Sequence, residues 1–376
     1  MRLFSRPLGI GQGETRAPWS FLPERPRFFQ YSSSCVSPPS PAYQPVSFPE
    51  PGGFVRSPRG FTYLLGRQLG TGAYGAVFDC VGPFDQPYAL KVFRPEGRAY
   101  EQVRADWLRE VTRLYKLRHP HIVYVHDYFE AGGLLYVALE RMDHSLEDML
   151  NQPLTDRLVV EITRQLLFAM QYLNDNEVIH NDLHAGNILV LQGDKLTVKI
   201  SDLGIAQELF GHAGVRPPIV HHRIMAPEVA AGGYSTKQSD LYQLGLLMYL
   251  MHTGAHAIDF TRGYDHIVQQ IREGLPRARA EALGTPIGDI TSVLLRRHEQ
   301  YRYSSPLQVW DDLSRLDLWR DGRQLSGFSR SRAPTGVFST GAHAAVPSPE
   351  QTEEERGPDT PRIGPTGTIP PPSKRG

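Results

Sequence analysis

Two carboxylates and one amide that could bind a cation together lie within one short stretch of the chain, HNDLHAGNILVLQGDKLTVKISDLG at residues 180–204. Asp182 and Asn187 are expected on a loop that follows a long amphipathic helix, and Asp202 follows an alternating apolar run at 196–200 that predicts a strand. Carboxylate and amide oxygens suit Mg²⁺ carrying substrate phosphates, because this ion keeps several waters and accepts only one or two protein carboxylates. The plainer alternative is that these residues only cap turns, where Asp and Asn are common.

Upstream, the stretch FTYLLGRQLGTGAYGAVF at 61–78 holds three glycines between two runs of β-forming residues. Gly70, Gly72 and Gly75 at this spacing allow a strand-turn-strand backbone to approach phosphate groups without Cβ clashes. The pattern alone also fits a plain hairpin, or a dinucleotide fingerprint if a helix followed. Because residues 76–80 continue as a strand, the dinucleotide interpretation is disfavoured.

The next candidate for a functional residue is a lysine inside a predicted apolar strand. Lys91 lies in the predicted strand 88–93, where a lysine is usually an edge or snorkelling residue. The helix predicted at 101–116 places Glu110 beside its inward apolar stripe, which consists of Trp107, Val111, Leu114 and Leu117. Glu110 can therefore pair with Lys91.

Composition limits the classes of function and partner. The chain has 376 residues with 40 Lys plus Arg and 40 Asp plus Glu, so no net field favours nucleic acid or an anionic membrane as a main partner. Its two cysteines, Cys35 and Cys80, cannot form a disulfide framework and indicate a reducing compartment. The first residues lack an apolar run long enough for a signal peptide, and Gln, Gly and His interrupt the apolar stretch 241–258, which favours a core helix over a membrane span. We therefore expect a cytoplasmic protein without a membrane span.

Much of the excess proline and glycine lies at the two ends. Residues 1–56 and 321–376 show no apolar period, so we expect a disordered Pro/Ser-rich arm and a disordered Pro/Gly/Ser/Thr-rich tail. The residues between them, 57–320, are expected to form one folded unit. Within that unit, 155–173 has the one-face periodicity of a long helix, and HSLEDML at 144–150 is expected to start a shorter one.

Several fragments, in the order seen in one family, resemble the motifs of protein kinases over residues 61 to about 318. They are the glycine-rich hairpin, Lys91 with Glu110, HPHIV at 119–123, HNDLHAGN, DLG, Ala226-Pro227-Glu228 and the helix near Asp240. The resemblance implies an α+β, bilobal protein-kinase-like fold. It has a small β-rich N-lobe at 57–140 and a larger helical C-lobe at 141–320.

The resemblance also implies roles for individual residues. Asp182 would orient the acceptor hydroxyl and take its proton, Lys91 would anchor the α- and β-phosphates of ATP, and Asn187 and Asp202 would hold Mg²⁺. The residues expected to bind ATP are Leu69, Gly70, Thr71, Gly72, Ala73, Tyr74, Gly75, Ala76, Val77, Ala89, Lys91, Glu110, Glu140, Met142 and Leu189. Arg302 would be the buried partner of Glu228. The implied reaction is transfer of the γ-phosphate to a Ser or Thr hydroxyl of a protein substrate.

Three departures from the family pattern bear on the substrate. Asn181, His184 and His221 stand where such kinases often have Arg, Lys and Thr. HNDLHAGN also looks like the loop of small-molecule phosphotransferases such as aminoglycoside and choline kinases. A pseudokinase scaffold that binds partners through its Pro-rich arms is a third alternative. The Ala-Pro-Glu segment favours a protein substrate, and the complete set Lys91, Asp182, Asn187 and Asp202 favours an active enzyme.

The segment 205–225 contains no Ser, Thr or Tyr, and Asn181 carries no charge to pair with a phosphate. We therefore expect that phosphorylation of this segment plays no part in activation. Metal-binding histidines are not expected either, because neither His119, His121 and His126 nor the pair His221-His222 matches a common ligand spacing.

Overall fold

Residues 47–72, 75–94, 99–316 and 368–369 are described by the computed structural model of the chain, and all of them belong to one unit, Pro45–Gly376. The expected arm therefore lies outside the described residues over 1–46. The expected tail lies outside them from 321 onward except for 368–369. Ala73 and Tyr74 of the glycine-rich hairpin also lie outside the described residues.

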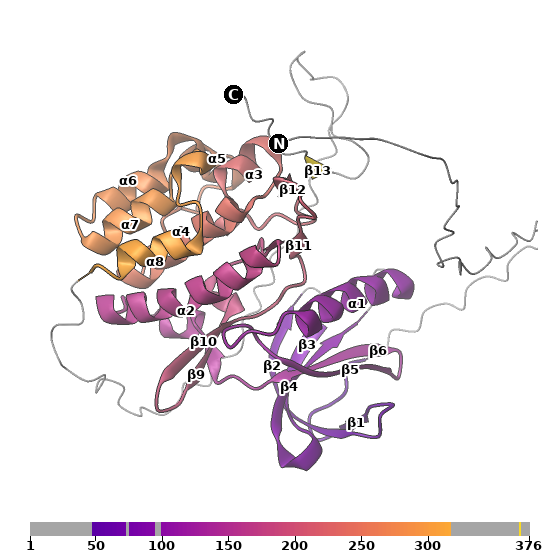
Figure 1. The fold of residues 1–376 in the computed structure, drawn as a ribbon. Helices are drawn as coiled ribbons and strands as arrows, with labels where there is room; N and C mark the ends of the chain where they lie inside the picture. Colours follow the sequence, from indigo (N-terminus) through magenta and orange to yellow (C-terminus); the bar gives the residue numbers. More distant parts are fainter. Residues whose placement is uncertain (1–46, 73–74, 95–98, 317–367, 370–376) are drawn as a thin grey trace, which may run out of the picture. The chain divides into compact units, whose positions relative to one another are not determined.

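The N-terminal lobe is built on a six-stranded antiparallel sheet in the order β1-β2-β3-β4-β6-β5 (Figure 1). Its strands are β1 (Phe54–Arg56), β2 (Thr62–Gly72), β3 (Gly75–Val81), β4 (Pro87–Phe93), β5 (Val125–Ala131) and β6 (Leu134–Glu140). Alternate side chains of β3 are buried, as the pleat of a half-covered sheet requires. One face carries a core of its own around Tyr63, Leu65 and Phe78.

Helix α1 (Tyr100–Lys116) lies against β5 and β6 on the other face of this sheet (Figure 1). The predicted stripe is confirmed, since Trp107, Val111 and Leu114 are all buried. Trp107 meets Tyr128 of β5 edge to face, with 5.9 Å between ring centroids. Glu110 is buried on the same helix, and a buried carboxylate requires a partner.

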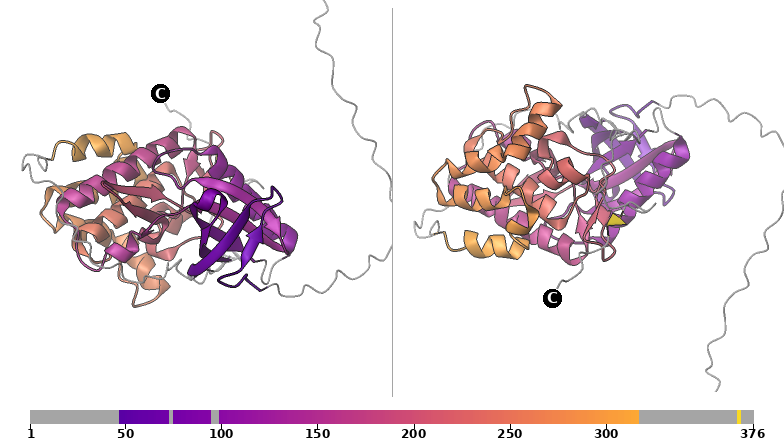
Figure 2. Two further views of the ribbon diagram at one scale, coloured as in Figure 1. Left: turned by 90° about the horizontal axis from the view of Figure 1, so that it is seen from below. Right: turned by 90° about the horizontal axis from the view of Figure 1, so that it is seen from above.

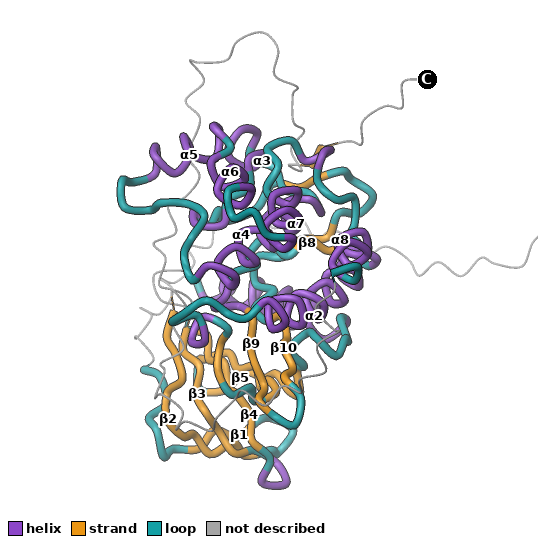
Figure 3. The backbone as a smooth tube through the Cα atoms, turned by 90° about the vertical axis from the view of Figure 1, so that its left-hand side faces the viewer, coloured by secondary structure: helices purple, strands orange, loops and turns teal. Residues whose placement is uncertain are grey.

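The C-terminal lobe is mainly helical, and Figures 2 and 3 show its helices gathered apart from the large sheet. The helices are α2 (Asp156–Asp175), α3 (Pro227–Gly232), α4 (Lys237–Thr253), α5 (Tyr264–Glu273), α6 (Leu275–Glu281), α7 (Pro286–Leu294) and α8 (Pro306–Leu313). The short strands are β7 (His144–Ser145), β8 (Val178–Ile179), β9 (Ile188–Gln192), β10 (Leu196–Ile200), β11 (Gln207–Glu208), β12 (Gly214–Val215) and β13 (Thr368–Ile369). Single 3-10 turns lie at Pro83–Asp85, Glu147–Met149, Ala185–Asn187, His222–Ile224 and Glu299–Tyr301.

The two lobes share one apolar core. It runs from Trp107 and Leu114 of α1 through Ile200 and Leu203 to Leu166 of α2. A backbone bridge crosses the same region, where Val123 N–H donates to Ile200 O (2.9 Å) and Ile200 N–H donates to His121 O (2.9 Å). The end of β10 is therefore tied to both lobes.

The predicted α+β bilobal fold is confirmed, and the long helix at 155–173 and the core helix within 241–258 are present as α2 and α4. None of the described helices combines the length and the apolar character needed to cross a lipid bilayer.

Three local predictions need correction. The tail at 321–376 is expected to be disordered, but Thr368–Ile369 forms β13, which pairs with β12. Residues 47–56 are expected in the N-terminal arm, but Phe54–Arg56 forms β1, which pairs with β2, and the Phe48 ring packs on Phe78 at 6.4 Å between centroids. Prolines around these apolar residues hide any sequence period. The segment 144–150 is expected to start a helix, but forms β7 and one 3-10 turn. Asp148 Oδ2 accepts bonds from Ser145 N–H and Oγ (2.9 and 2.7 Å), and such local side-chain bonds compete with helix formation.

The predicted pairing of Arg302 with Glu228 is confirmed, and the pair is buried. Arg302 Nη1 and Nη2 donate to Glu228 Oε1 and Oε2 at 2.8 and 2.7 Å, a two-pronged arrangement. Ser239 Oγ also donates to Glu228 Oε1 (2.5 Å), and the guanidinium lies 4.9 Å from the Tyr242 ring centroid. This cluster joins the start of α3 to α4 and to the segment before α8.

Arg302→Ala should destabilise the fold strongly, because it leaves the Glu228 carboxylate buried without its counter-charge. We expect the free energy of unfolding to fall by about 3–5 kcal/mol in urea denaturation. Arg315→Ala is the matched control, since Arg315 pairs with Asp312 at the surface, where such a pair contributes less than about 1 kcal/mol. Equal effects of the two substitutions would contradict the structural role of the buried pair.

Candidate functional site

The loop carrying Asp182 lies between β8 and β9 and is held by helix α4. Asp240 Oδ2 and Oδ1 accept bonds from the backbone N–H groups of His180 and Asn181 (2.7 and 2.9 Å). Gln243, one turn further along α4, accepts from Leu183 N–H and donates to Asn181 O, both at 2.9 Å. Burial raises the pKa of Asp240 to about 6, against the opposing influence of these backbone donors. The sequence points to Asp240, but the role of Gln243 has no sequence signal, because its partners are backbone atoms.

The backbone segments that carry the predicted metal ligands Asn187 and Asp202 lie side by side. Ser201, which precedes Asp202, donates its N–H and Oγ to Asn187 O at 2.8 and 2.9 Å. Asn187 Nδ2 in turn donates to Asp182 O (2.9 Å) and Asp182 Oδ2 (3.0 Å). These bonds use the amide nitrogen and leave the amide oxygen of Asn187 to ligate a cation. One amide oxygen and the Asp202 carboxylate form a donor set that fits Mg²⁺.

Lys91 connects this region to the N-terminal lobe. Its Nζ lies 2.9 Å from Glu110 Oε1, so the predicted pair is present, and 3.2 Å from Asp202 Oδ1. Burial lowers the pKa of Lys91, but the charges of Asp202 and Glu110 outweigh it and raise that pKa above its usual range. The ammonium group therefore stays charged and can bind an anionic ligand group.

The Asp202 backbone is held in a left-handed conformation, with φ at 57°. Gly204 N–H donates to Asp202 Oδ1 (3.2 Å), and Arg113 of α1 donates to the backbone oxygen of Leu203 (3.2 Å). Leu203 is fully buried in the shared core with Leu114, as its apolar character predicts. These contacts fix the direction in which the Asp202 carboxylate projects.

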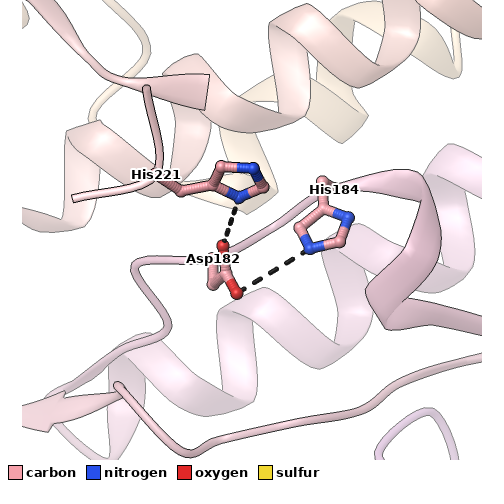
Figure 4. Close-up of side chains that lie close together, drawn as sticks. All are labelled: Asp182, His184 and His221. Atoms are coloured by element: carbon pink, nitrogen blue, oxygen red, sulfur yellow. Dashed lines mark hydrogen bonds and ion pairs between the residues drawn. The ribbon is translucent and has the colours of Figure 1, made fainter. Parts of the chain in front are cut away.

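Two histidines point at the Asp182 carboxylate (Figure 4). His221, just before the 3-10 turn 222–224, bonds through Nδ1 to Asp182 Oδ1 (2.9 Å), and His184 Nε2 lies 3.7 Å from Asp182 Oδ2. Burial alone would raise the pKa of Asp182, but the His221 hydrogen bond and the two histidines lower it to about 2. Asp182 is therefore an ionised hydrogen-bond acceptor at neutral pH.

Two neutral amide side chains bond to the segment after Asp202. Asn181 Nδ2 donates to Ile205 O (3.2 Å) and lies 3.4 Å from Gln207 Oε1. Gln207 Nε2 reaches on to Arg216 O (2.9 Å), and β11 pairs with β8 beside the loop. Strand β12 of the same segment pairs with β13.

The residues expected to bind ATP are distributed over the adjoining strands. Leu69 to Gly72 end β2, Gly75 to Val77 start β3, and Ala89 lies on β4 opposite Leu139 of β6. Glu140 ends β6 with its carboxylate on Lys199 Nζ (2.7 Å), and Met142 and Leu189 follow in the connection and in β9. A Cβ on Gly75 would lie 1.9 Å from Val92 O, so strand packing alone already requires this glycine. The other glycines remain the candidates for contact with phosphate.

Comparison with known proteins places this arrangement in a family. The family profile described as "Protein kinase domain" matches residues 63–311. The chain belongs to the protein kinase family.

Similar proteins carry names from the same family. The chain is 32% identical over 192 residues to "Probable serine/threonine-protein kinase zyg-1" of Caenorhabditis briggsae, covering 50% of this chain and 26% of that protein. It is 29% identical over 223 residues to "Probable serine/threonine-protein kinase PknB" of Lactococcus lactis, covering 57% of this chain and 35% of the relative. It is 28% identical over 250 residues to "Serine/threonine-protein kinase Nek4" of the mouse, covering 64% of this chain and 31% of that protein. The chain thus spans about a quarter to a third of the length of these curated relatives.

Removing the His221 imidazole should raise the pKa of Asp182. Since the hydrogen bond from His221 is the largest influence that lowers this pKa, we expect His221→Ala to raise it by at least about one pH unit. A ¹³C NMR titration of the side-chain carboxyl would measure it. In the wild-type chain the lowered pKa stabilises the fold above pH 3.8, and this contribution is lost as the pH falls toward 2. In His221→Ala the folded and unfolded pKa values of Asp182 lie closer together, so this contribution should be smaller and should be fully lost at a higher pH.

His222→Ala is the matched control, because the His222 ring packs on Tyr264 at 4.6 Å between centroids and makes none of the described bonds to Asp182. An unchanged Asp182 pKa in His221→Ala would contradict the assigned interaction.

Proposed function

We propose that this kinase-family chain catalyses ATP- and Mg²⁺-dependent transfer of the γ-phosphate to a Ser or Thr hydroxyl of a protein. The observation that carries the proposal is the connected set of side chains in the site. Lys91 bonds to Asp202, Ser201 bonds to Asn187, and Asn187 bonds to Asp182. A phosphate anchor, two cation ligands and an ionised acceptor are thereby assembled through direct contacts.

The chemistry is divided between the bound groups and the protein. ATP supplies the transferable phosphoryl group, and Mg²⁺ neutralises charge on its oxygens. Lys91, kept charged and positioned by Glu110, binds phosphate oxygens. Asp182 accepts a hydrogen bond from the substrate hydroxyl, orients it, and takes its proton as the hydroxyl reacts. Because Asp182 has a low pKa, orientation contributes more than basicity.

The segment from Ile205 to Glu228 supports a protein substrate over a small molecule. Its far end is anchored by the buried Glu228 and Arg302 pair, and its near end by Asn181. A firmly held surface segment beside the Asp182 loop suits docking of an extended peptide. The names of the relatives point to Ser or Thr as the acceptor residue.

The two alternatives make different predictions. A small-molecule phosphotransferase would label aminoglycosides or choline rather than protein. A pseudokinase scaffold would label neither and would act through partners of the Pro-rich arms, which lie outside the described residues apart from 47–56 and 368–369. The bonded set Lys91, Asp202, Asn187 and Asp182 speaks against the scaffold.

The proposed location of the kinase is the cytoplasm, and nucleic acid is not proposed as a partner. The low cysteine count supports a reducing compartment such as the cytoplasm. The equal numbers of acidic and basic residues argue against nucleic acid as a partner.

Replacing Asp182 by Asn or Lys91 by Ala should lower kcat at least about a hundredfold, since each change removes a group that acts on the reacting atoms. Labelled ATP with protein acceptors, aminoglycosides and choline would identify the substrate class. Equilibrium ATP binding should fall more in Lys91→Ala than in Asp182→Asn. Asp194→Asn and Lys195→Ala are matched controls, because both residues lie exposed in the turn between β9 and β10. Wild-type turnover in either active-site variant would refute the mechanism.

Activity should not depend on phosphorylation of the segment 205–225, because Asn181 and Gln207 already hold it. Phosphatase treatment should leave the initial rate unchanged. Asn181→Ala should lower the rate about tenfold, as expected when hydrogen bonds of about 1 kcal/mol each are lost. Asn151→Ala, at an exposed position, is the matched control. Loss of activity on phosphatase treatment, with a phosphate mapped to 205–225, would contradict this prediction.

A further inference from the structure

The fold places three groups that can bind a metal around one point in the active site (Figure 4). Nδ1 of His221 lies 2.9 Å from Asp182 Oδ1, and Nε2 of His184 lies 3.7 Å from Asp182 Oδ2. One ligand atom from each of the three residues lies within 4.8 Å of the other two. Zinc ligands 2.0–2.2 Å from the ion stand about 3.3 Å apart in a tetrahedron, so the three atoms need only draw closer by up to about 1.5 Å to surround an ion.

Two imidazoles and one carboxylate favour a different ion from the one proposed for Asn187 and Asp202. Mg²⁺ prefers oxygen ligands, whereas imidazole suits Zn²⁺ and related transition ions. Zinc sites with an open position commonly have three protein ligands and one water, and two His with one acidic residue is an established set. The exposed fractions of the Asp182, His184 and His221 side chains are 22%, 19% and 10%, so the cluster is partly open to solvent.

We propose that Asp182, His184 and His221 bind Zn²⁺, or a transition ion of similar chemistry, and that this ion inhibits the kinase. A coordinated Asp182 carboxylate cannot accept the hydrogen bond of the substrate hydroxyl. Metal binding stands independently of the proposed function, whereas inhibition rests on it. The absence of a metal-ligand spacing in the sequence is no obstacle, because residues 182 and 221 lie far apart in the chain and meet only in the fold.

The resting hydrogen bonds determine what the metal must displace. His184 Nδ1 accepts a bond from Gly186 N–H (3.1 Å), so the neutral ring carries its proton on Nε2, toward Asp182. Coordination through Nε2 requires the other tautomer, whose Nδ1–H needs an acceptor. The bond from Gly186 N–H is then lost, because an Nδ1 that carries a hydrogen no longer accepts. We therefore expect weaker binding than in preformed structural zinc sites.

Titration calorimetry with Zn²⁺ and the full chain tests the site. We expect one ion per chain and an affinity at least about tenfold lower in both His184→Gln and His221→Gln. His222→Ala should bind as the wild type does, and so should Lys91→Ala, which keeps the cluster but should lack phosphoryl transfer. Co²⁺ as a probe should give the visible absorption of a tetrahedral site in the wild type. Melting curves identify any variant that fails to fold. If a variant does not fold, the cobalt spectrum of the wild type decides whether the site binds a metal.

Zinc affinity that is unchanged in both glutamine variants, or lost only in Asp202→Ala, would overturn the proposed site. Inhibition is measured with free Zn²⁺ set by a chelator buffer, because ATP itself binds zinc. Half-inhibition should occur near the measured Kd in the wild type and in His222→Ala, and at least about tenfold higher in His184→Gln. Binding without inhibition would overturn the regulatory part alone. If the wild type transfers no phosphate at all, the proposed function fails while the zinc titration still decides the site.

Discussion

A single ammonium group holds the centre of this structure together. Lys91 projects from β4 between Glu110 of α1 and Asp202 at the end of β10, so three elements from both lobes meet at its charge. Without it, the buried Glu110 carboxylate would lose this counter-charge, while burial and the Asp202 charge both raise its pKa. The ion pair thereby links α1, beside the shared core around Leu114 and Leu203, to β4 and to Asp202.

The loop that carries Asp182 depends on α4 in a similar way. Asn181 adopts a left-handed backbone conformation, with φ at 69°, which most residues avoid. Asp240 and Gln243 offset that cost by bonding to the backbone on both sides of it. The buried Glu228 and Arg302 pair anchors α4 from the other side. The geometry of the active site therefore originates in contacts that never touch a substrate.

Three side chains around Asp182 differ from those that protein kinases often have: Asn181, His184 and His221. Asn181 is neutral and bonds directly to the following segment, which has no hydroxyl side chain between residues 205 and 225. The segment therefore offers no hydroxyl that could accept a phosphate, and residue 181 carries no charge that could pair with one. His184 and His221 instead introduce imidazole nitrogens next to the Asp182 carboxylate. This member of the protein kinase family thus has a neutral side chain at position 181 and two imidazoles beside the Asp182 carboxylate.

The sequence alone was sufficient for the bilobal fold, for the Lys91 and Glu110 pair and for the Glu228 and Arg302 pair. The fold and the Lys91 and Glu110 pair follow from apolar periodicity and from motifs in a fixed order, and the Glu228 and Arg302 pair follows from the resemblance to protein kinases. The sequence did not predict β1, because prolines mask the period of its apolar residues. It also did not predict that 144–150 is not a helix, because Asp148 bonds to Ser145 and this bond competes with the helix. The support from Gln243 and the meeting of His184 with His221 were decided only by tertiary structure. Their partners are backbone atoms or residues distant in the chain, and spacing along a sequence carries no information about such distances.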